Sequence, residues 1–392
     1  MTDSPRVALL TYSTRPRGGV VHSLCLAEAL HRMGVPVHLF ALGDPRVGLF
    51  RPTTAPHTIF EAPPPAETLE ERVFAMVDTL MQRLAEVLPG FDLVHAEDCV
   101  VARAALDLRD AGFGIPVIRT VHHVDDFTTR ALVECQRRSI VAPDQVLVVS
   151  EYWKDVLERD FGVRATVVLN GVDANRFRRR ADFDGTALRA SIGANGRFLF
   201  LTVGGVEPRK GSLELLEALA RLRELLDPPP LLAVVGAHAF QDHAEYRDRF
   251  FGRARALRVE IGRDIAMLGT VPDDDLVDWY QAADAFVFPS VKEGWGLAVL
   301  EALAAGLPVI TSDIPVFREY LTEDEGVLVE AGNVDALAEA MGRVARDHRF
   351  RASLAAAGPG VASRYTWEAS ARAHAELYRE LASVGRADQP GG

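Results

Sequence analysis

Short apolar runs alternate with longer amphipathic stretches along nearly the whole chain, and the rhythm restarts halfway. The apolar runs predict strands at residues 7–12, 35–40, 93–96, 116–122, 145–150 and 166–169, and then at residues 198–203, 231–236, 265–268, 285–289, 308–311 and 327–329. Strands that alternate with helices are typical of parallel sheets wrapped by helices. The pattern therefore predicts an α/β protein built from two doubly wound, Rossmann-like domains.

The amphipathic stretches and one polar segment suggest how the chain is divided. Residues 20–33 and 70–87 have helical periodicity. No strand or long apolar helix is visible in residues 173–197, where the sequence RFRRRADFDG is typical of a linker. We therefore expect a first domain at 1–175, a linker at 176–197, a second domain at 198–364 and a final amphipathic helix at 365–385.

The composition is that of a globular protein with a large core, since 48% of the 392 residues are hydrophobic and 25% are charged. The 43 basic and 55 acidic side chains give a formal net charge of −12, which disfavours binding to nucleic acid or to anionic bilayers. The apolar run at residues 7–10 is too short for an export signal or a membrane span. Cys25, Cys99 and Cys135 lack metal-ligand spacing, which favours reduced thiols in the cytoplasm over zinc or disulfides.

The segment 288–310, FPSVKEGWGLAVLEALAAGLPVI, offers the clearest candidate chemistry. A strand ends at Pro289, a loop with Glu293 follows, and a helix starts near Leu297. Such a turn presents backbone N–H groups to an anion, and carboxylates accept hydrogen bonds from sugar hydroxyls. Glu293 and Glu301 could therefore bind two different parts of one elongated ligand. Alternatively, Glu293 only favours the helix dipole and Glu301 is exposed, although apolar neighbours predict a mostly buried Glu301.

The two glutamates with seven residues between them, the preceding DAFVFPS and the following GLPVITSD resemble the C-terminal domain of retaining, GT-B-fold glycosyltransferases of family 4. Four further blocks extend the resemblance over almost the whole chain: Gly18 and Gly19 after the first strand, LNGVD at 169–173, VGGVEPRKG at 203–211 and YTWEASARAHAELY at 365–378. The resemblance implies a GT-B fold, in which two domains face a central cleft and a C-terminal helix returns to the first domain.

The resemblance also implies roles for residues of the second domain. Glu293 would bind hydroxyls of the transferred sugar, with Gly294 beside it as a substrate-binding residue. The N–H groups near Gly296 and Leu297 would meet the diphosphate, and Glu301 would accept hydrogen bonds from the ribose hydroxyls.

Five more positions complete the implied site. Lys210 would neutralise charge on the diphosphate as it leaves. Val271, in the block LGTVP, lies where the family brings backbone groups to the base. His122, in TVHH at the end of a first-domain strand, matches the position of a histidine near the sugar, and His123 beside it is the alternative. Gly18 and Gly19 would bind substrate from the first domain.

One position departs from the family. Members commonly carry an arginine five residues before the lysine, and Gly205 stands there in this chain. Either Arg209 supplies the second positive charge, or Gly205 lets the backbone approach the phosphate closely.

The acidic run Asp273–Asp275 has two interpretations as well. It could bind a metal ion, or it could form the first turn of the helix that follows Pro272, and we favour the helix turn. Lys210 and the backbone N–H groups at the start of a helix would supply the positive charge that the diphosphate needs. We therefore expect neither a metal ion nor a cofactor.

The resemblance, taken with these observations, implies a retaining, metal-independent glycosyltransferase of the hexosyltransferase type, which moves a sugar from a nucleotide-diphosphate sugar to a small hydroxyl acceptor. Residues 63–87 carry five acidic and two basic side chains, so we expect no strong membrane binding. Two alternatives stay open: a nucleotide-sugar 2-epimerase of the same fold, and a non-catalytic nucleotide-sugar-binding protein.

Overall fold

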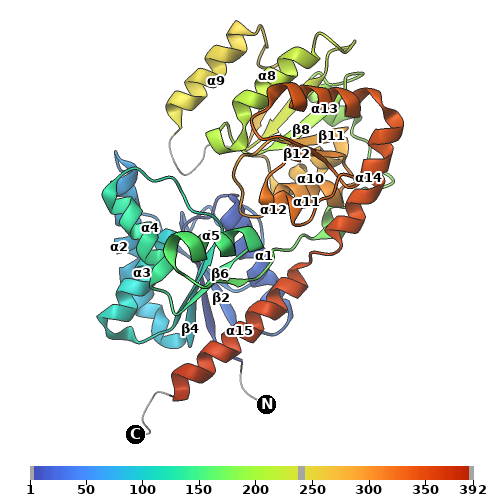
Figure 1. Ribbon diagram of the computed structural model, residues 1–392. Coiled ribbons are helices and arrows are strands. Elements are labelled where there is room, and N and C mark those ends of the chain that lie inside the picture. Colours follow the sequence, from blue (N-terminus) through green and yellow to red (C-terminus); the bar gives the residue numbers. More distant parts are fainter. Residues whose placement is uncertain (1–3, 237–242, 388–392) are drawn as a thin grey trace. The chain divides into compact units, whose positions relative to one another are not determined.

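The computed structural model describes residues 4–236 and 243–387, and contacts within the chain divide it into two compact units. Unit 1 comprises Met1–Gly171 and Trp367–Gly392, and unit 2 comprises Val172–Thr366 (Figure 1). Each unit contains one parallel sheet with its own helices.

Unit 1 is built on a seven-stranded parallel sheet with the order β3-β2-β1-β4-β5-β6-β7. Its strands are β1 (Val7–Thr11), β2 (Val37–Gly43), β3 (His57–Glu61), β4 (Leu93–Ala96), β5 (Val117–Val121), β6 (Gln145–Val148) and β7 (Thr166–Val167). Its helices are α1 (Gly18–Arg32), α2 (Leu69–Val87), α3 (Cys99–Leu108), α4 (Arg130–Val141), α5 (Glu151–Phe161) and α15 (Trp367–Ala387), with short helical turns η1 (Leu88–Gly90) and η2 (Arg109–Phe113). Every residue of β1, β4 and β5 is buried, as expected of central strands covered by helices on both faces.

The C-terminal helix α15 belongs to unit 1, as the resemblance implies. It packs against α1, as Figure 1 shows. The hydroxyl of Tyr378 lies 2.7 Å from Nδ1 of His95, and both side chains are fully buried. The end of the chain therefore completes the core of the unit in which the chain begins.

Unit 2 has a six-stranded parallel sheet with the order β10-β9-β8-β11-β12-β13. Its strands are β8 (Leu199–Val203), β9 (Leu231–Val235), β10 (Ile265–Gly269), β11 (Ala285–Phe288), β12 (Val309–Ser312) and β13 (Val327–Val329). Its helices are α6 (Ala174–Phe177), α7 (Thr186–Ser191), α8 (Ser212–Leu222), α9 (Ala244–Ala256), α10 (Asp273–Ala282), α11 (Leu297–Ala304), α12 (Pro315–Arg318), α13 (Val334–Arg346) and α14 (His348–Ala362), with a helical turn η3 (Pro208–Lys210). A buried apolar cluster that includes Phe200, Leu219 and Ile310 packs the helices onto this sheet.

These two sheets confirm the predicted α/β fold class, and every predicted strand is present. The prediction missed β3, an edge strand of which only Phe60 is buried, because its sequence HTIFE lacks a clear apolar run. The segment 176–197 contains α7 and lies within unit 2. There Arg176 and Arg189 bind Asp273 and Asp284 at 2.5 and 3.0 Å.

Candidate active site

Two loops meet at the carboxyl ends of β8 and β11 in unit 2. Gly211 has a φ of +64°, and a Cβ there would lie 2.2 Å from the carbonyl oxygen of Pro289, so only glycine permits this approach. The N–H of Val291 donates to the carbonyl of Arg209 at 2.8 Å. These contacts hold the Arg209–Lys210 loop against the loop that carries Glu293.

Both cations converge on one carboxylate. Nζ of Lys210 and a guanidinium N–H of Arg209 donate to the same oxygen, Oε1 of Glu293, at 2.6 and 3.1 Å. Burial alone would raise the pKa of Glu293, which is 9% exposed, but Lys210 and Arg209 lower it. Burial and the neighbouring Arg209 lower the pKa of Lys210. Arg209 therefore lies beside Lys210 on the carboxylate of Glu293.

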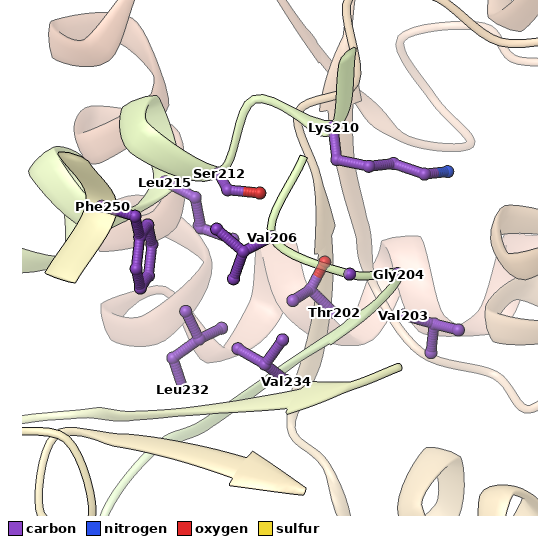
Figure 2. Close-up of a pocket in the computed structure, with 11 residues that line it drawn as sticks. Thr202, Val203, Gly204, Val206, Lys210, Ser212, Leu215, Leu232, Val234 and Phe250 are labelled. Atoms are coloured by element: carbon purple, nitrogen blue, oxygen red, sulfur yellow. The ribbon is translucent and has the colours of Figure 1, made fainter. Parts of the chain in front are cut away.

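A pocket lies beside this loop. Figure 2 shows the apolar side chains of Leu232, Val234 and Phe250 gathered on one side and Lys210 extending away from them. At Gly204, where φ is +145°, a Cβ would lie 3.2 Å from Cε of Lys210, so the glycine leaves room for the lysine chain. The full lining comprises Thr202, Val203, Gly204, Gly205, Val206, Lys210, Ser212, Leu215, Leu232, Val234 and Phe250.

Helix α11 starts directly after the Glu293 loop. Gly294 and Gly296 are buried, and Gly296 has a φ of +94°. A Cβ at Gly296 would lie 2.6 Å from the ring of Phe317, so both the backbone and the packing require glycine. The predicted strand, glycine loop and helix that begins at Leu297 are all present. At the start of α11 the N–H groups of Val299 and Leu300 donate to the carbonyl oxygen of Gly296 at 2.9 and 3.3 Å, and the N–H groups of Leu297 and Ala298 precede these bonds.

Glu301 lies on the second turn of α11 and is partly buried. The hydroxyl of Tyr280 donates to its Oε2 at 2.8 Å. Burial raises the pKa of Glu301 to about 7 against the lowering effects of Tyr280 and Arg176. The carboxyl therefore keeps its proton to a higher pH than an ordinary glutamate does.

The acidic run Asp273–Asp275 forms the first turn of α10, which agrees with the favoured interpretation. Asp273 is bound by Arg176 at 2.5 Å. Val271 lies in the connection between β10 and α10, partly buried, next to the amino end of that helix.

The remaining predicted residues lie together in unit 1. Gly18 and Gly19 open α1, and a Cβ at Gly19 would lie 3.7 Å from Cδ2 of His122, which follows β5. The His122 side chain is 15% exposed, and burial lowers its pKa to about 4 although Glu97 opposes this shift. His123 is 31% exposed and lies 3.4 Å from Asp125. Of the two histidines, His122 is the one next to the glycine turn.

A buried cluster behind His122 was not predicted. Oε2 of Glu97 lies 3.0 Å from Nε2 of His122 and 3.4 Å from Nε2 of His22. The donor atoms of these three side chains lie within 4.8 Å of one another, the one group of three metal-type ligands found among the residues that the structure describes. The signal in the sequence was the carboxylate in VHAED directly after an apolar strand.

Unit 2 therefore places paired cations, a buried carboxylate and the start of a helix at the carboxyl ends of parallel strands. The family models Glycosyltransferase Family 4 and Glycosyl transferases group 1 match residues 16–176 and 185–360. The chain belongs to this glycosyltransferase family, and the GT-B fold expected from the resemblance is confirmed.

Individual relatives match over almost the whole chain. A D-inositol 3-phosphate glycosyltransferase of Xylanimonas cellulosilytica is 30% identical, with 97% of each chain covered. A phosphatidyl-myo-inositol mannosyltransferase of Mycobacterium leprae is 27% identical, with 95% of this chain and 96% of the relative covered. The solved structure of Anabaena Alr3699/HepE in complex with UDP and glucose superposes with a TM-score of 0.79 at 19% identity, over 96% of this chain and 100% of the other.

Within residues 4–236 and 243–387, no helix has the length and apolar character needed to cross a membrane.

Proposed function

We propose that this glycosyltransferase moves a sugar from a nucleotide-diphosphate sugar to a hydroxyl acceptor with retention of anomeric configuration, and that it requires no metal. The convergence of Lys210 and Arg209 on Glu293 is the observation that carries the proposal. Two cations held 2.6 and 3.1 Å from a sugar-binding carboxylate are well placed to exchange it for a diphosphate.

In this proposal the donor replaces contacts that the protein makes with itself. The diphosphate binds the ammonium of Lys210 and the guanidinium of Arg209, and it also accepts hydrogen bonds from the N–H groups at Gly296 and Leu297. Glu293, released from both cations, then accepts hydroxyl groups of the sugar. The bond between the anomeric carbon and the diphosphate oxygen breaks while Lys210 and Arg209 stabilise the charge on the leaving oxygen.

Retention follows if the acceptor hydroxyl attacks from the face that the diphosphate leaves. The departing diphosphate takes the proton of that hydroxyl, and so no protein nucleophile is needed. Glu97, a carboxylate close to His122, is 1% exposed and held by imidazoles, which makes it unsuitable as a nucleophile. His122 is assigned to the hydroxyl groups of the transferred sugar.

The nucleoside half of the donor is assigned to the helix side of unit 2. Glu301 would accept the ribose hydroxyls, and the backbone around Val271 would meet the base. The complex of Anabaena Alr3699/HepE with UDP and glucose supports a nucleoside diphosphate as the leaving group.

We assign a small, hydrophilic acceptor rather than a lipid. The apolar face of α2, formed by Val73, Met76, Val77, Leu80 and Leu84, is buried within unit 1. Its exposed positions include Glu71, Asp78 and Glu86, which repel an anionic bilayer. The D-inositol 3-phosphate relative supports a phosphorylated polyol, and the three cysteine thiols, none in a disulfide, support a reducing cytoplasm.

Incubation with a panel of nucleotide sugars, with and without inositol phosphates and sugar phosphates, tests this function by mass spectrometry. The proposal expects release of nucleoside diphosphate together with an acceptor heavier by one sugar. Lys210→Ala should abolish most of this turnover, whereas Lys154→Ala, which removes an exposed lysine paired with Glu151, should not. An epimerised nucleotide sugar formed without acceptor, detected by proton NMR because its mass is unchanged, would indicate the epimerase alternative, and binding without any turnover would indicate a non-catalytic protein.

A further inference from the structure

A carboxylate lies buried directly behind His122. Glu97 follows β4, His122 follows β5 and His22 lies on α1, so three elements that are separate in sequence bring these side chains together. The exposed fraction of the Glu97 side chain is 1%, and that of His22 is zero. A charged group this deep needs partners to offset the cost of its burial.

Imidazoles supply those partners. Burial alone would raise the pKa of the Glu97 carboxyl, but His22, His95 and His122 hold it well below its ordinary value. Oε2 accepts a hydrogen bond from Nε2 of His122 at 3.0 Å, and Nε2 of His22 lies 3.4 Å from the same oxygen. The other ring nitrogen of His22, Nδ1, lies 2.9 Å from Oδ1 of Asn170, and this contact fixes the orientation of the His22 ring.

This arrangement fixes which nitrogen of His122 carries hydrogen. A carboxylate can only accept, so the imidazole nitrogen that faces Glu97 must be the donor. Nε2 therefore carries the hydrogen, and Nδ1 of the neutral ring is left with a lone pair. The structure shows no hydrogen bond from a described residue to Nδ1, and the side chain is 15% exposed. The free nitrogen is consequently an acceptor, open to a ligand hydroxyl.

We propose that Glu97 is a positioning residue that holds His122 as its Nε2–H tautomer, in a fixed ring orientation, so that Nδ1 accepts a hydrogen bond from a hydroxyl of the transferred sugar. The inference rests on the proposed function, since it takes His122 as a sugar-binding residue.

The tautomer can be measured without any substrate. In ¹⁵N-histidine-labelled protein, long-range proton–nitrogen correlation spectra distinguish an Nε2–H ring, an Nδ1–H ring and a doubly protonated ring, and His122→Gln assigns the signal. The proposal expects an Nε2–H ring for His122 at neutral pH. An Nδ1–H ring, or stoichiometric bound metal that leaves Nε2 without hydrogen, would overturn it.

A kinetic double-mutant cycle separates positioning from a merely structural role. With the donor identified by the nucleotide-sugar panel, Glu97→Gln should lower kcat by about tenfold or more, as the loss of a charged hydrogen-bond partner predicts, with little change in donor KM. In a His122→Ala background the same substitution should add almost nothing, because Glu97 acts through His122. Glu67→Gln, at an exposed position, is the matched control.

The outcomes also separate this inference from the proposed function. If the two substitutions lower kcat independently, so that their effects multiply in the double variant, the positioning role of Glu97 is contradicted. The proposed glycosyl transfer is not contradicted by that result, provided the wild-type enzyme transfers sugar. Failure of the wild-type protein to transfer sugar contradicts the proposed function, and the tautomer measurement still decides whether Glu97 sets the state of His122. If Glu97→Gln does not fold, the wild-type spectrum alone decides the inference.

Discussion

Replacing Glu301 with glutamine should make the protein more stable at pH 8 than the wild type, and only slightly so at pH 5. Burial raises the pKa of this carboxyl from 4.5 to about 7. Between these two values the folded protein keeps a proton that the unfolded chain has released, so the contribution of Glu301 to stability falls as the pH rises through this window. Glutamine has a similar shape and does not titrate.

The magnitude follows from the size of the shift. A change from 4.5 to about 7, at about 1.4 kcal/mol for each unit, corresponds to about 3 kcal/mol of stability lost above pH 7. We expect the difference in the free energy of unfolding, glutamine variant minus wild type, to increase by this order between pH 5 and pH 8. Other titrating groups are common to both proteins and cancel in that difference.

Urea unfolding of both proteins at pH 5, 6, 7 and 8, followed by circular dichroism, measures the difference directly. A difference that stays constant across this range, within about 0.5 kcal/mol, would refute the assignment of a raised pKa to Glu301. A difference that grows in the opposite direction would mean that the carboxyl is stabilised as an anion in the free protein.

The same titration should appear in donor binding. A carboxylate accepts two ribose hydroxyls better than a carboxylic acid does, so donor affinity in the wild type should rise between pH 6 and pH 8. In Glu301→Gln we expect donor affinity to be weaker at pH 8 and its rise with pH to be lost, as measured by calorimetry with a nucleoside diphosphate. If donor affinity depends on pH equally in both proteins, Glu301 does not bind the ribose.

Three further changes have defined outcomes. Lys210→Ala should lower kcat by about 10²-fold, because the leaving diphosphate loses its charge partner, and unchanged turnover in steady-state assays would contradict that role. Gly296→Ala should cost about 1–3 kcal/mol in urea unfolding, because φ is +94° and a Cβ would lie 2.6 Å from the ring of Phe317; a neutral effect would show that the start of α11 can adjust. Turnover should persist in excess EDTA, and its loss followed by recovery with magnesium or manganese would reveal a metal requirement.

Much of the fold could be predicted from the sequence because its strands are buried on both faces. Runs such as 7–10 and 285–288 are apolar throughout, which marks them as central parallel strands. The edge strand β3 lacks this signal, since one of its faces is not covered and only Phe60 is buried. The strand, loop and helix around Glu293 were predictable for a local reason, because glycines and an alanine-rich helix follow one another in the chain.

Side-chain convergence could not be predicted in the same way. Adjacent residues such as Arg209 and Lys210 need not point in one direction, and they do so here because Gly211 lets the loop press against Pro289. Glu97 was missed for a different reason. Its partner His122 is 25 residues away, and the two meet only because β4 and β5 pair in parallel within the sheet.

Proton NMR of a reaction with an α-linked nucleotide sugar tests the central claim most directly, because the anomeric signals of donor and product are seen in one spectrum. The account predicts that the donor signal disappears, that free nucleoside diphosphate appears in equal amount, and that the new glycoside is α-linked. With Lys210→Ala the donor signal should remain. A β-linked product would contradict retention. Turnover in a variant in which both Lys210 and Glu293 are replaced would contradict the assignment of the active site to these residues.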